Sequence, residues 1–396
     1  AVGSTNNLTF FLLSLIFGLS NGAGVIVSQY YGAGRFDNMR RVVTAIIWIS
    51  AVLSLIISLC GVMGVSLFLH LLSVPENVIG YAADYLRIIF LFAAGSVAFN
   101  VSSSILRSMG DSKTPLYALI LASLLNVVLD ILFISTFHMG VAGAAIATVI
   151  SQCVSALYCI LYLIKKKNDF HLCSLPKLPE KHNIMQIFKI GVPTSFQSTL
   201  ISLGGMSVQR LVNSFGPAVM AAYASAGKID GIAIQVIVAL GVALSVFTGQ
   251  NIGQRRFDRI TKGLHSTLIM SISAAVIIAG TAFWGGEQIM SIFLDPEKSS
   301  EAIKIGAQYL SIMGIAYVVC GIMQSYQNII RGAGDANTCL VAGITELAGR
   351  IFFAYLLSPF LGILGIWIAT PLSWACGCIV PVLRYYSGKW KNKIVT

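Results

Sequence analysis

Residues 42–70 read VVTAIIWISAVLSLIISLCGVMGVSLFLH, a run without any Asp, Glu, Lys or Arg. This run is longer than the roughly 20 apolar residues that cross the hydrocarbon core of a bilayer as one helix. The rest of the 396-residue chain is similar, since 56% of its residues are hydrophobic and only 10% are charged, against about 25% charged residues in an average globular protein. The composition therefore predicts an all-α polytopic membrane protein and excludes a cytosolic enzyme.

Glycine, proline and charged residues divide the chain into eleven apolar segments of membrane-spanning length. We expect helices at roughly 5–31, 42–70, 79–106, 115–136, 140–164, 184–213, 219–249, 263–285, 303–330, 338–357 and 362–386. Twenty of the 26 basic residues lie in alternate connections of this series, and the positive-inside rule places those connections and the C-terminus in the cytoplasm. The net charge of +11 is therefore an orientation signal, typical of a bacterial-type cell membrane protein, and indicates no nucleic-acid partner.

The chain contains an internal repeat with an offset of 221 to 224 residues, in which residues 29–37, 105–114 and 140–148 recur as residues 250–258, 329–338 and 362–370. We expect an N-lobe at 1–166, a cytoplasmic linker at 167–183, a C-lobe at 184–388 and a basic tail at 389–396. The first lobe has no counterpart of residues 184–221, so we expect eleven of the twelve helices of a parent with two homologous six-helix bundles. Parallel repeats of this kind are typical of secondary transporters.

Asp130 lies inside the fourth predicted segment, where an aspartate costs a few kcal/mol or more to insert. Asn126 lies four residues earlier, so both side chains project from one face of the helix. Thr148 in the next segment and Asn100 in the preceding one would complete a pocket of oxygen atoms, which suits Na⁺ or a proton relay. The alternative interpretation is an aspartate neutralised by hydrogen bonds from neighbouring helices.

The second repeat has the opposite chemistry at this helix, because Asn126 aligns with Arg350 and Asp130 aligns with Ala354. Glu346 and Arg350 are four residues apart and are predicted to form a structural ion pair. No other cluster of metal ligands is apparent, and no cofactor is predicted.

The remaining charges in the apolar segments receive no role from the sequence. Asp84 and Arg87 are predicted to form a surface ion pair, since they are three residues apart at the end of a segment. Arg210, Lys228 and Asp230 are interpreted as residues near the outer ends of helices, where long side chains reach the membrane surface at little cost.

Five motifs follow one another in a characteristic order: SQYYGAG (28–34), RSMGD (107–111), NVVLD (126–130), GVAGAAIAT (140–148) and GVP (191–193). In this order and spacing the chain resembles the multidrug and toxic compound extrusion (MATE) family over essentially its whole length. The resemblance implies a twelve-helix, V-shaped, monomeric exporter without a cofactor, which exchanges cationic or amphipathic compounds for Na⁺ or H⁺ by alternating access.

By motif, Asn126, Asp130 and Thr148 match the N-lobe cation site of the family, and Asn100 matches a polar position in the substrate cavity. Residues 184–213 lack the carboxylate that some members carry there, and Gln197 is a polar candidate instead, which favours the DinF-like branch. A flippase for lipid-linked saccharides or a related amphiphile is the alternative, because a fold does not fix a substrate. A membrane enzyme is not favoured, since no nucleophile–base or metal-ligand constellation is apparent.

Overall fold

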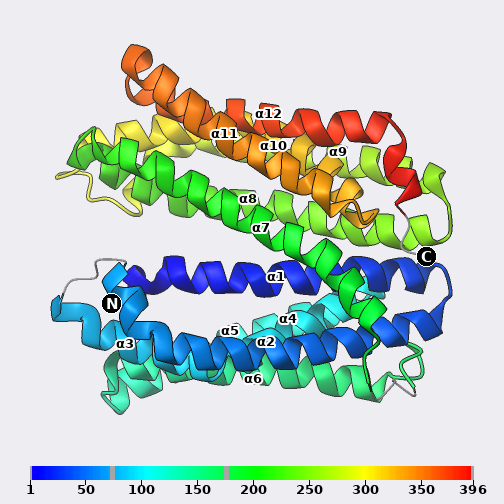
Figure 1. The fold of residues 1–396 in the computed structure, drawn as a ribbon. Coiled ribbons are helices and arrows are strands. Elements are labelled where there is room, and N and C mark those ends of the chain that lie inside the picture. The colour runs from blue at the N-terminus through cyan, green and yellow to red at the C-terminus, as the bar shows by residue number, and fades with distance from the viewer. Residues whose placement is uncertain (1, 72–75, 174–177, 394–396) are drawn as a thin grey trace. The chain divides into compact units, whose positions relative to one another are not determined.

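The computed structural model describes residues 2–71, 76–173 and 178–393 of the chain (Figure 1). Its described residues form helices and short connections, with no β-strand among them. The chain divides into two compact units, Ala1–Ser195 and Phe196–Thr396. Residues 174–177 of the expected linker and 394–396 of the expected tail lie outside the described residues.

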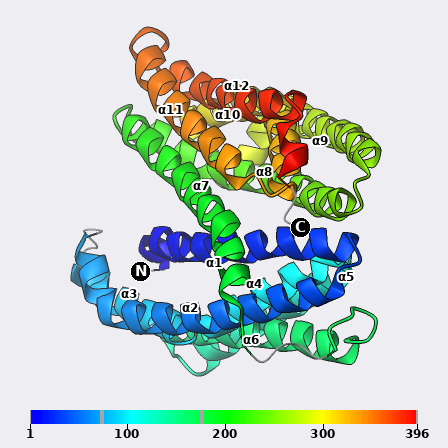
Figure 2. The same ribbon diagram turned by 45° about the vertical axis from the view of Figure 1, so that its right-hand side comes forward.

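Most helices of the first unit run side by side in both views, and only the last of them, the first part of α7, crosses the others obliquely (Figures 1 and 2). They are α1 (Val2–Gly32), α2 (Phe36–Leu71), α3 (Glu76–Leu91), α4 (Ala93–Ser108), α5 (Lys113–Asp130), the π-helix η1 (Ile131–Thr136), α6 (Gly140–Lys165) and the first part of α7 (Lys181–Asn213). The second unit contains the rest of α7, α8 (Pro217–Gly253), α9 (Phe257–Ser291), α10 (Ser300–Gly332), α11 (Ala336–Leu361), α12 (Ile363–Tyr386) and the 3₁₀-helix η2 (Lys389–Asn392).

Each of the eleven predicted segments is helical, and one of them departs from a single continuous helix. Residues 79–106 form two helices, α3 and α4, which meet at Phe92 with a bend of 49°. Eight of the described helices are long and apolar enough to cross a membrane, or nine if the bent pair counts as one span. Large apolar side chains on their outer faces are exposed, as Met63 (84%), Trp284 (82%) and Phe360 (80%) illustrate. Lipid is the solvent that such faces require, and the prediction of a multi-pass membrane protein is confirmed.

The two units repeat the same helix boundaries, as the sequence offsets predict. The end of α1 at Gly32 and the start of α2 at Phe36 recur at Gly253 and Phe257, where α8 ends and α9 begins. Both boundaries are shifted by 221 residues, the offset found for the sequence motif that spans them.

Two glycines end equivalent helices of the repeats, since Gly110 follows α4 and Gly334 follows α10 with φ angles of +94° and +90°. Glycine adopts this left-handed conformation without the steric penalty that a side chain brings, so both glycines favour the end of the helix before them. The aspartates that follow these glycines, Asp111 and Asp335, have different hydrogen-bond donors. The Asp111 carboxylate accepts a hydrogen bond from the Thr114 amide at 3.0 Å, whereas the Asp335 carboxylate accepts one from the Arg384 Nε at 2.7 Å.

The packing within each unit determines which helices carry the candidate sites. In the first unit, α6 packs against α3, α4 and α5. In the second, α10 packs against α8, α9 and α12, and α11 packs against α12. The second unit has a large buried core in which Tyr317 and Trp367 are almost completely buried.

The connection from α6 to α7 is held against the turn between α1 and α2. The His171 ring stacks on the Phe36 ring with centroids 3.8 Å apart, and the Arg40 Nε donates a hydrogen bond to the His171 carbonyl oxygen at 2.7 Å. Arg41 forms an ion pair of 2.7 Å with Glu180. The described part of the expected linker therefore has fixed contacts with the first unit.

Candidate cation-binding sites

Asp130 is the last residue of α5, and the helix continues beyond it as the π-helix η1. The combined apolar span runs from Lys113 to Thr136, so Asp130 lies six residues before its end, or about 9 Å at a rise of ~1.5 Å per residue. Asp130 is therefore inside the span but nearer to one end than to the centre. π-Helical turns occur frequently at functional sites.

The Asp130 carboxylate has no permanent partner in the described part of the chain. Its Oδ1 atom is buried and has no hydrogen-bond partner, and the Nδ2 atom of Asn126 is also buried without one. None of the ion pairs among the described residues includes Asp130. Tyr85 of α3 lies within electrostatic range of it. A buried carboxylate oxygen without a donor is costly, so this geometry does not match an aspartate satisfied by neighbouring helices.

Thr148 and Asn100 lie on the helices that pack together behind α5. The Thr148 hydroxyl on α6 donates a hydrogen bond of 2.9 Å to the Ala144 carbonyl, and the Asn100 Nδ2 on α4 donates one of 2.8 Å to the Ser96 carbonyl. Both bonds use donors and leave the side-chain oxygens able to accept or to coordinate. The structure thus brings Asp130 and Asn126 onto one helix face and carries Thr148 and Asn100 on other helices of the same unit.

Gln197 is buried within the second unit and is already bonded. Its Oε1 atom accepts a hydrogen bond of 2.8 Å from the Arg331 guanidinium, and its side chain contacts α11 so closely that a Cβ atom on Gly343 would lie 2.9 Å from it. Arg331 also donates to the Asn328 side chain at 2.9 Å, while its Nε atom is buried without an acceptor. The role of Gln197 in a substrate cavity stays a prediction.

Glu346 and Arg350 form an ion pair on α11, with 2.8 Å between the Glu346 Oε1 and the Arg350 Nη2. Their side chains are only 5% and 13% exposed, so the pair is inside the unit rather than at its surface. The outer pair Asp84–Arg87, by contrast, is separated by 3.6 Å and largely exposed, as predicted.

Asp230 is the site residue that the sequence analysis missed. It lies thirteen residues after Pro217, where α8 begins, so the interpretation as a residue near a helix end is wrong. Tyr309 donates a hydrogen bond of 3.4 Å to its Oδ2 atom, and Tyr317 donates a hydrogen bond to its Oδ1 atom. The position of an acidic residue in an apolar run was a visible signal, but the partners on α10 lie 79 and 87 residues away.

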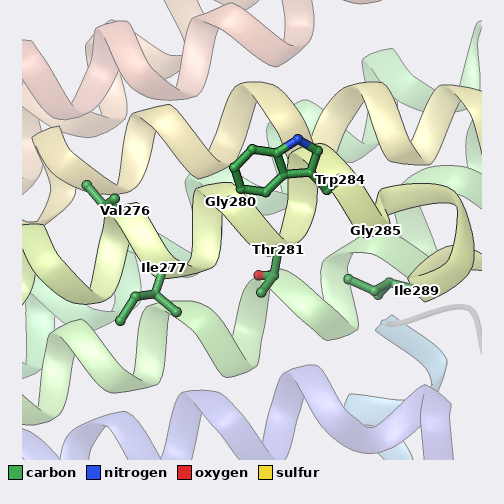
Figure 3. A pocket seen from close by; sticks show the side chains of 7 residues that line it. All are labelled: Val276, Ile277, Gly280, Thr281, Trp284, Gly285 and Ile289. Atoms are coloured by element: carbon green, nitrogen blue, oxygen red, sulfur yellow. The ribbon is translucent and has the colours of Figure 1, made fainter.

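Two cavities lined by described residues do not adjoin these polar groups. The larger, of about 610 Å³, is lined by seven residues of α9 alone, with Trp284 along one side (Figure 3). Its one hydroxyl, on Thr281, donates a hydrogen bond to the Ile278 carbonyl at 2.8 Å. The smaller cavity, of about 530 Å³, is lined by apolar side chains of α3 and α6 and by Phe92. Both are lined almost entirely by apolar side chains and glycines.

The comparisons with known proteins agree with this architecture. A family model described as MatE matches residues 1–132 and 193–356. The probable multidrug resistance protein YpnP of Bacillus subtilis is 33% identical over 392 residues, which cover 99% of this chain and 86% of YpnP. The multidrug export protein MepA of Staphylococcus aureus is 23% identical over 374 residues, which cover 92% of this chain and 80% of MepA.

Solved structures share the fold at lower sequence identity. A structure described as the outward-facing conformation of a multidrug resistance MATE family transporter matches with a TM-score of 0.92 and 22% identity, covering 99% of this chain and 88% of that one. A transporter of the MOP superfamily from Pyrococcus furiosus matches with a TM-score of 0.91 and 21% identity, covering 100% of this chain and 88% of that one. With these matches the all-α fold is confirmed, and the chain belongs to the MatE family, whose members are transporters rather than enzymes.

Proposed function

We propose that the chain is a secondary active exporter of cationic or amphipathic compounds, driven by exchange with Na⁺ or H⁺. Its membership in a family with relatives named for multidrug resistance and export supports a small-molecule cargo. The sequence contains no Gly-x₄-Gly-Lys-Ser/Thr phosphate-binding loop, so an ion gradient is the energy source that remains. One elementary charge that moves down 100 mV releases about 2.3 kcal/mol, enough for roughly fiftyfold accumulation.

The observation that carries this proposal is the Asp130 carboxylate, which has a buried oxygen without a partner inside an apolar span. A proton or Na⁺ at this carboxylate removes the negative charge that a cationic compound would otherwise pair with. The ion and the compound therefore compete for the first unit, and the bound ion favours release of the compound to the outside. Asn126 and Thr148 supply further oxygen atoms for the ion in this scheme.

The proposal extends to the parts of the chain that surround this carboxylate. Asn100 and Gln197 contact the compound in a polar cavity, as in the DinF-like branch, and Glu346 with Arg350 acts as a structural ion pair. The two repeats act as lobes at 1–166 and 184–388 that alternate access between the two sides of the membrane. The C-terminus and the linker at 167–183 are cytoplasmic, the basic tail at 389–396 is cytoplasmic as well, and the protein acts as a monomer.

A flippase for lipid-linked saccharides or a related amphiphile is the second candidate. Arg331 favours a flippase, because its described hydrogen-bond partners are amide oxygens rather than a carboxylate. A guanidinium whose charge is not neutralised by a carboxylate can pair with an anionic headgroup. The MOP-superfamily structure from Pyrococcus furiosus is itself described as having a binding pocket of reversed polarity that suggests a different function.

The test uses the purified full chain in proteoliposomes that contain a fluorescent cationic dye. A Na⁺ gradient and a pH gradient are imposed separately, with protein-free liposomes as the control. An exporter moves the dye against its gradient when at least one of the two ion gradients is present. A protein that leaves the dye in place under both gradients, but moves a fluorescent pyrophosphate-linked lipid between leaflets, is a flippase.

A further inference from the structure

We propose that Asp230 binds an exchangeable proton inside the second unit. This proposal goes beyond the transport function and does not depend on it, because Asp130 belongs to the first unit. The sequence gives Asp230 no role, and the geometry around it is what points to one.

Asp230 lies far from both ends of α8. Thirteen residues separate it from Pro217, or about 20 Å along the helix axis, so the carboxylate is not at an end of the helix. Tyr317 and Tyr309 of α10 each donate a hydrogen bond to one of its two oxygen atoms. A carboxylate inside a packed helical unit is maintained only where protein groups replace the water around it.

The charges around Asp230 do not balance. Arg350 of α11 acts electrostatically on the Asp230 carboxylate and is itself paired with Glu346 at 2.8 Å, so two carboxylates share one guanidinium. Lys228 does not compensate, since its Nζ atom lies over the Phe293 ring, 5.4 Å from the centroid. With all groups ionised the cluster carries a net charge of −1, which is costly in an apolar interior. One bound monovalent cation makes it neutral.

The ionisable neighbours of this cluster are few and come from three helices. α8 contributes Tyr223, α10 contributes Tyr309, Tyr317 and Cys320, and α11 contributes Glu346 and Arg350. α9, which also packs against α8, contributes no group that acts on Asp230. No other charged group in the described part of the chain is therefore available to neutralise the carboxylate.

A proton suits this position better than a metal ion. Trp367 stacks on Tyr223 with centroids 5.6 Å apart and meets Tyr309 edge-on at 4.8 Å, so aromatic rings form the wall beside the carboxylate. Hard metal ions require several oxygen ligands, and both carboxylate oxygens already accept a tyrosine hydroxyl. No group of three His, Cys, Asp or Glu side chains suited to a metal occurs in the residues that the structure describes.

The chemistry of the step is a simple protonation. The Asp230 carboxylate takes one proton, becomes a neutral carboxyl group, and can then donate a hydrogen bond to a tyrosine oxygen. The cluster changes from −1 to zero, and no covalent bond other than the new O–H is formed. Release of the proton restores the negative charge and the two hydrogen bonds from the tyrosines.

The experiment measures the protonated carboxyl band by pH-difference infrared spectroscopy on the full chain in lipid nanodiscs. We expect Asp230→Asn to lose one component of that band and to take up one proton fewer per molecule, as measured with a pH-sensitive dye. Lys228→Met is the matched control, because it removes a charge from the same helix outside the cluster, and it should keep the component. Asp130→Asn should keep it as well, which separates this proposal from the transport mechanism.

Tyr317→Phe keeps the proposal testable if Asp230→Asn does not fold. The variant retains the Asp230 carboxyl group but removes one of its hydrogen bonds. The infrared band component of that carboxyl group should therefore persist and shift to a higher frequency. Three results would overturn the proposal: an unchanged band in Asp230→Asn, an unchanged frequency in Tyr317→Phe, or loss of the component when Na⁺ is added at constant pH.

Discussion

Removal of the guanidinium at Arg350 should destabilise the second unit much more than removal of its carboxylate partner. At 2.8 Å the attraction between Glu346 and Arg350 is about 6 kcal/mol for an effective dielectric constant of about 20. Desolvation offsets part of this, and loss of one partner of a buried pair costs about 3–5 kcal/mol. Arg350→Met leaves Asp230 and Glu346 as two uncompensated carboxylates, so it should reach that range.

Glu346→Gln should cost less, about 1–3 kcal/mol, the usual penalty for a weakened buried hydrogen bond. Here the guanidinium remains beside Asp230 and the two charges balance. The double variant Glu346→Gln/Arg350→Met has the same net charge as the unmodified cluster, so its cost should be smaller than the sum of the single costs.

The assay is unfolding by SDS in mixed micelles, followed by the helical circular dichroism signal, with the free energy of unfolding compared among the variants. Asp84→Asn, in an exposed ion pair, is the control and should change this free energy by less than about 1 kcal/mol. Equal costs for the two single variants, or costs that simply add in the double variant, would refute the charge balance on which this reasoning rests.

Three further predictions concern packing and the tail. Gly365→Ala should destabilise the α11–α12 pair by about 1–3 kcal/mol, because its Cβ atom would lie 2.5 Å from the backbone of α11. The control Gly80→Ala adds a Cβ atom that meets no atom within 4 Å, so it should not lower the free energy of unfolding measured in SDS. Trp390→Ala removes a fully buried side chain that stacks on the end of α12, so it should accelerate tryptic cleavage in the tail. The control Trp284→Ala, at an 82% exposed position, should leave the cleavage rate unchanged. Asp335→Asn should also accelerate this cleavage, since it breaks the buried ion pair that holds α12 to the start of α11; an unchanged rate would mean that the pair contributes little.

The helices could be predicted from the sequence because their signal is local. A run such as residues 42–70 needs no partner to be recognised, since its length and lack of charge determine that it spans a bilayer. The repeat could be predicted for the same reason, because identical residues at a constant offset are visible without a structure. The local signal for the bend between α3 and α4 is Gly95 followed by Ser96, three residues after Phe92, and such a pair alone does not predict a break in an apolar segment.

The candidate sites were predictable only where both partners lie on one helix. Asp130 with Asn126, and Glu346 with Arg350, follow from a spacing of four residues. Asp230 was assigned no role because its hydrogen-bond donors lie on another helix, and Gln197 was not expected to bond Arg331 for the same reason. Such pairings depend on how helices rotate against each other, which hydropathy does not encode.

The central claim is that an ion at Asp130 drives export, and transport by one pair of variants tests it most directly. Asp130→Asn and Asp84→Asn each remove one acidic charge from the first unit, but only the first lies at the proposed ion site. In proteoliposomes with an imposed ion gradient, we expect Asp130→Asn to insert yet to bind the cationic dye more weakly and to lose gradient-driven efflux, while Asp84→Asn exports normally. Efflux by Asp130→Asn at the rate of the unmodified protein would contradict the account.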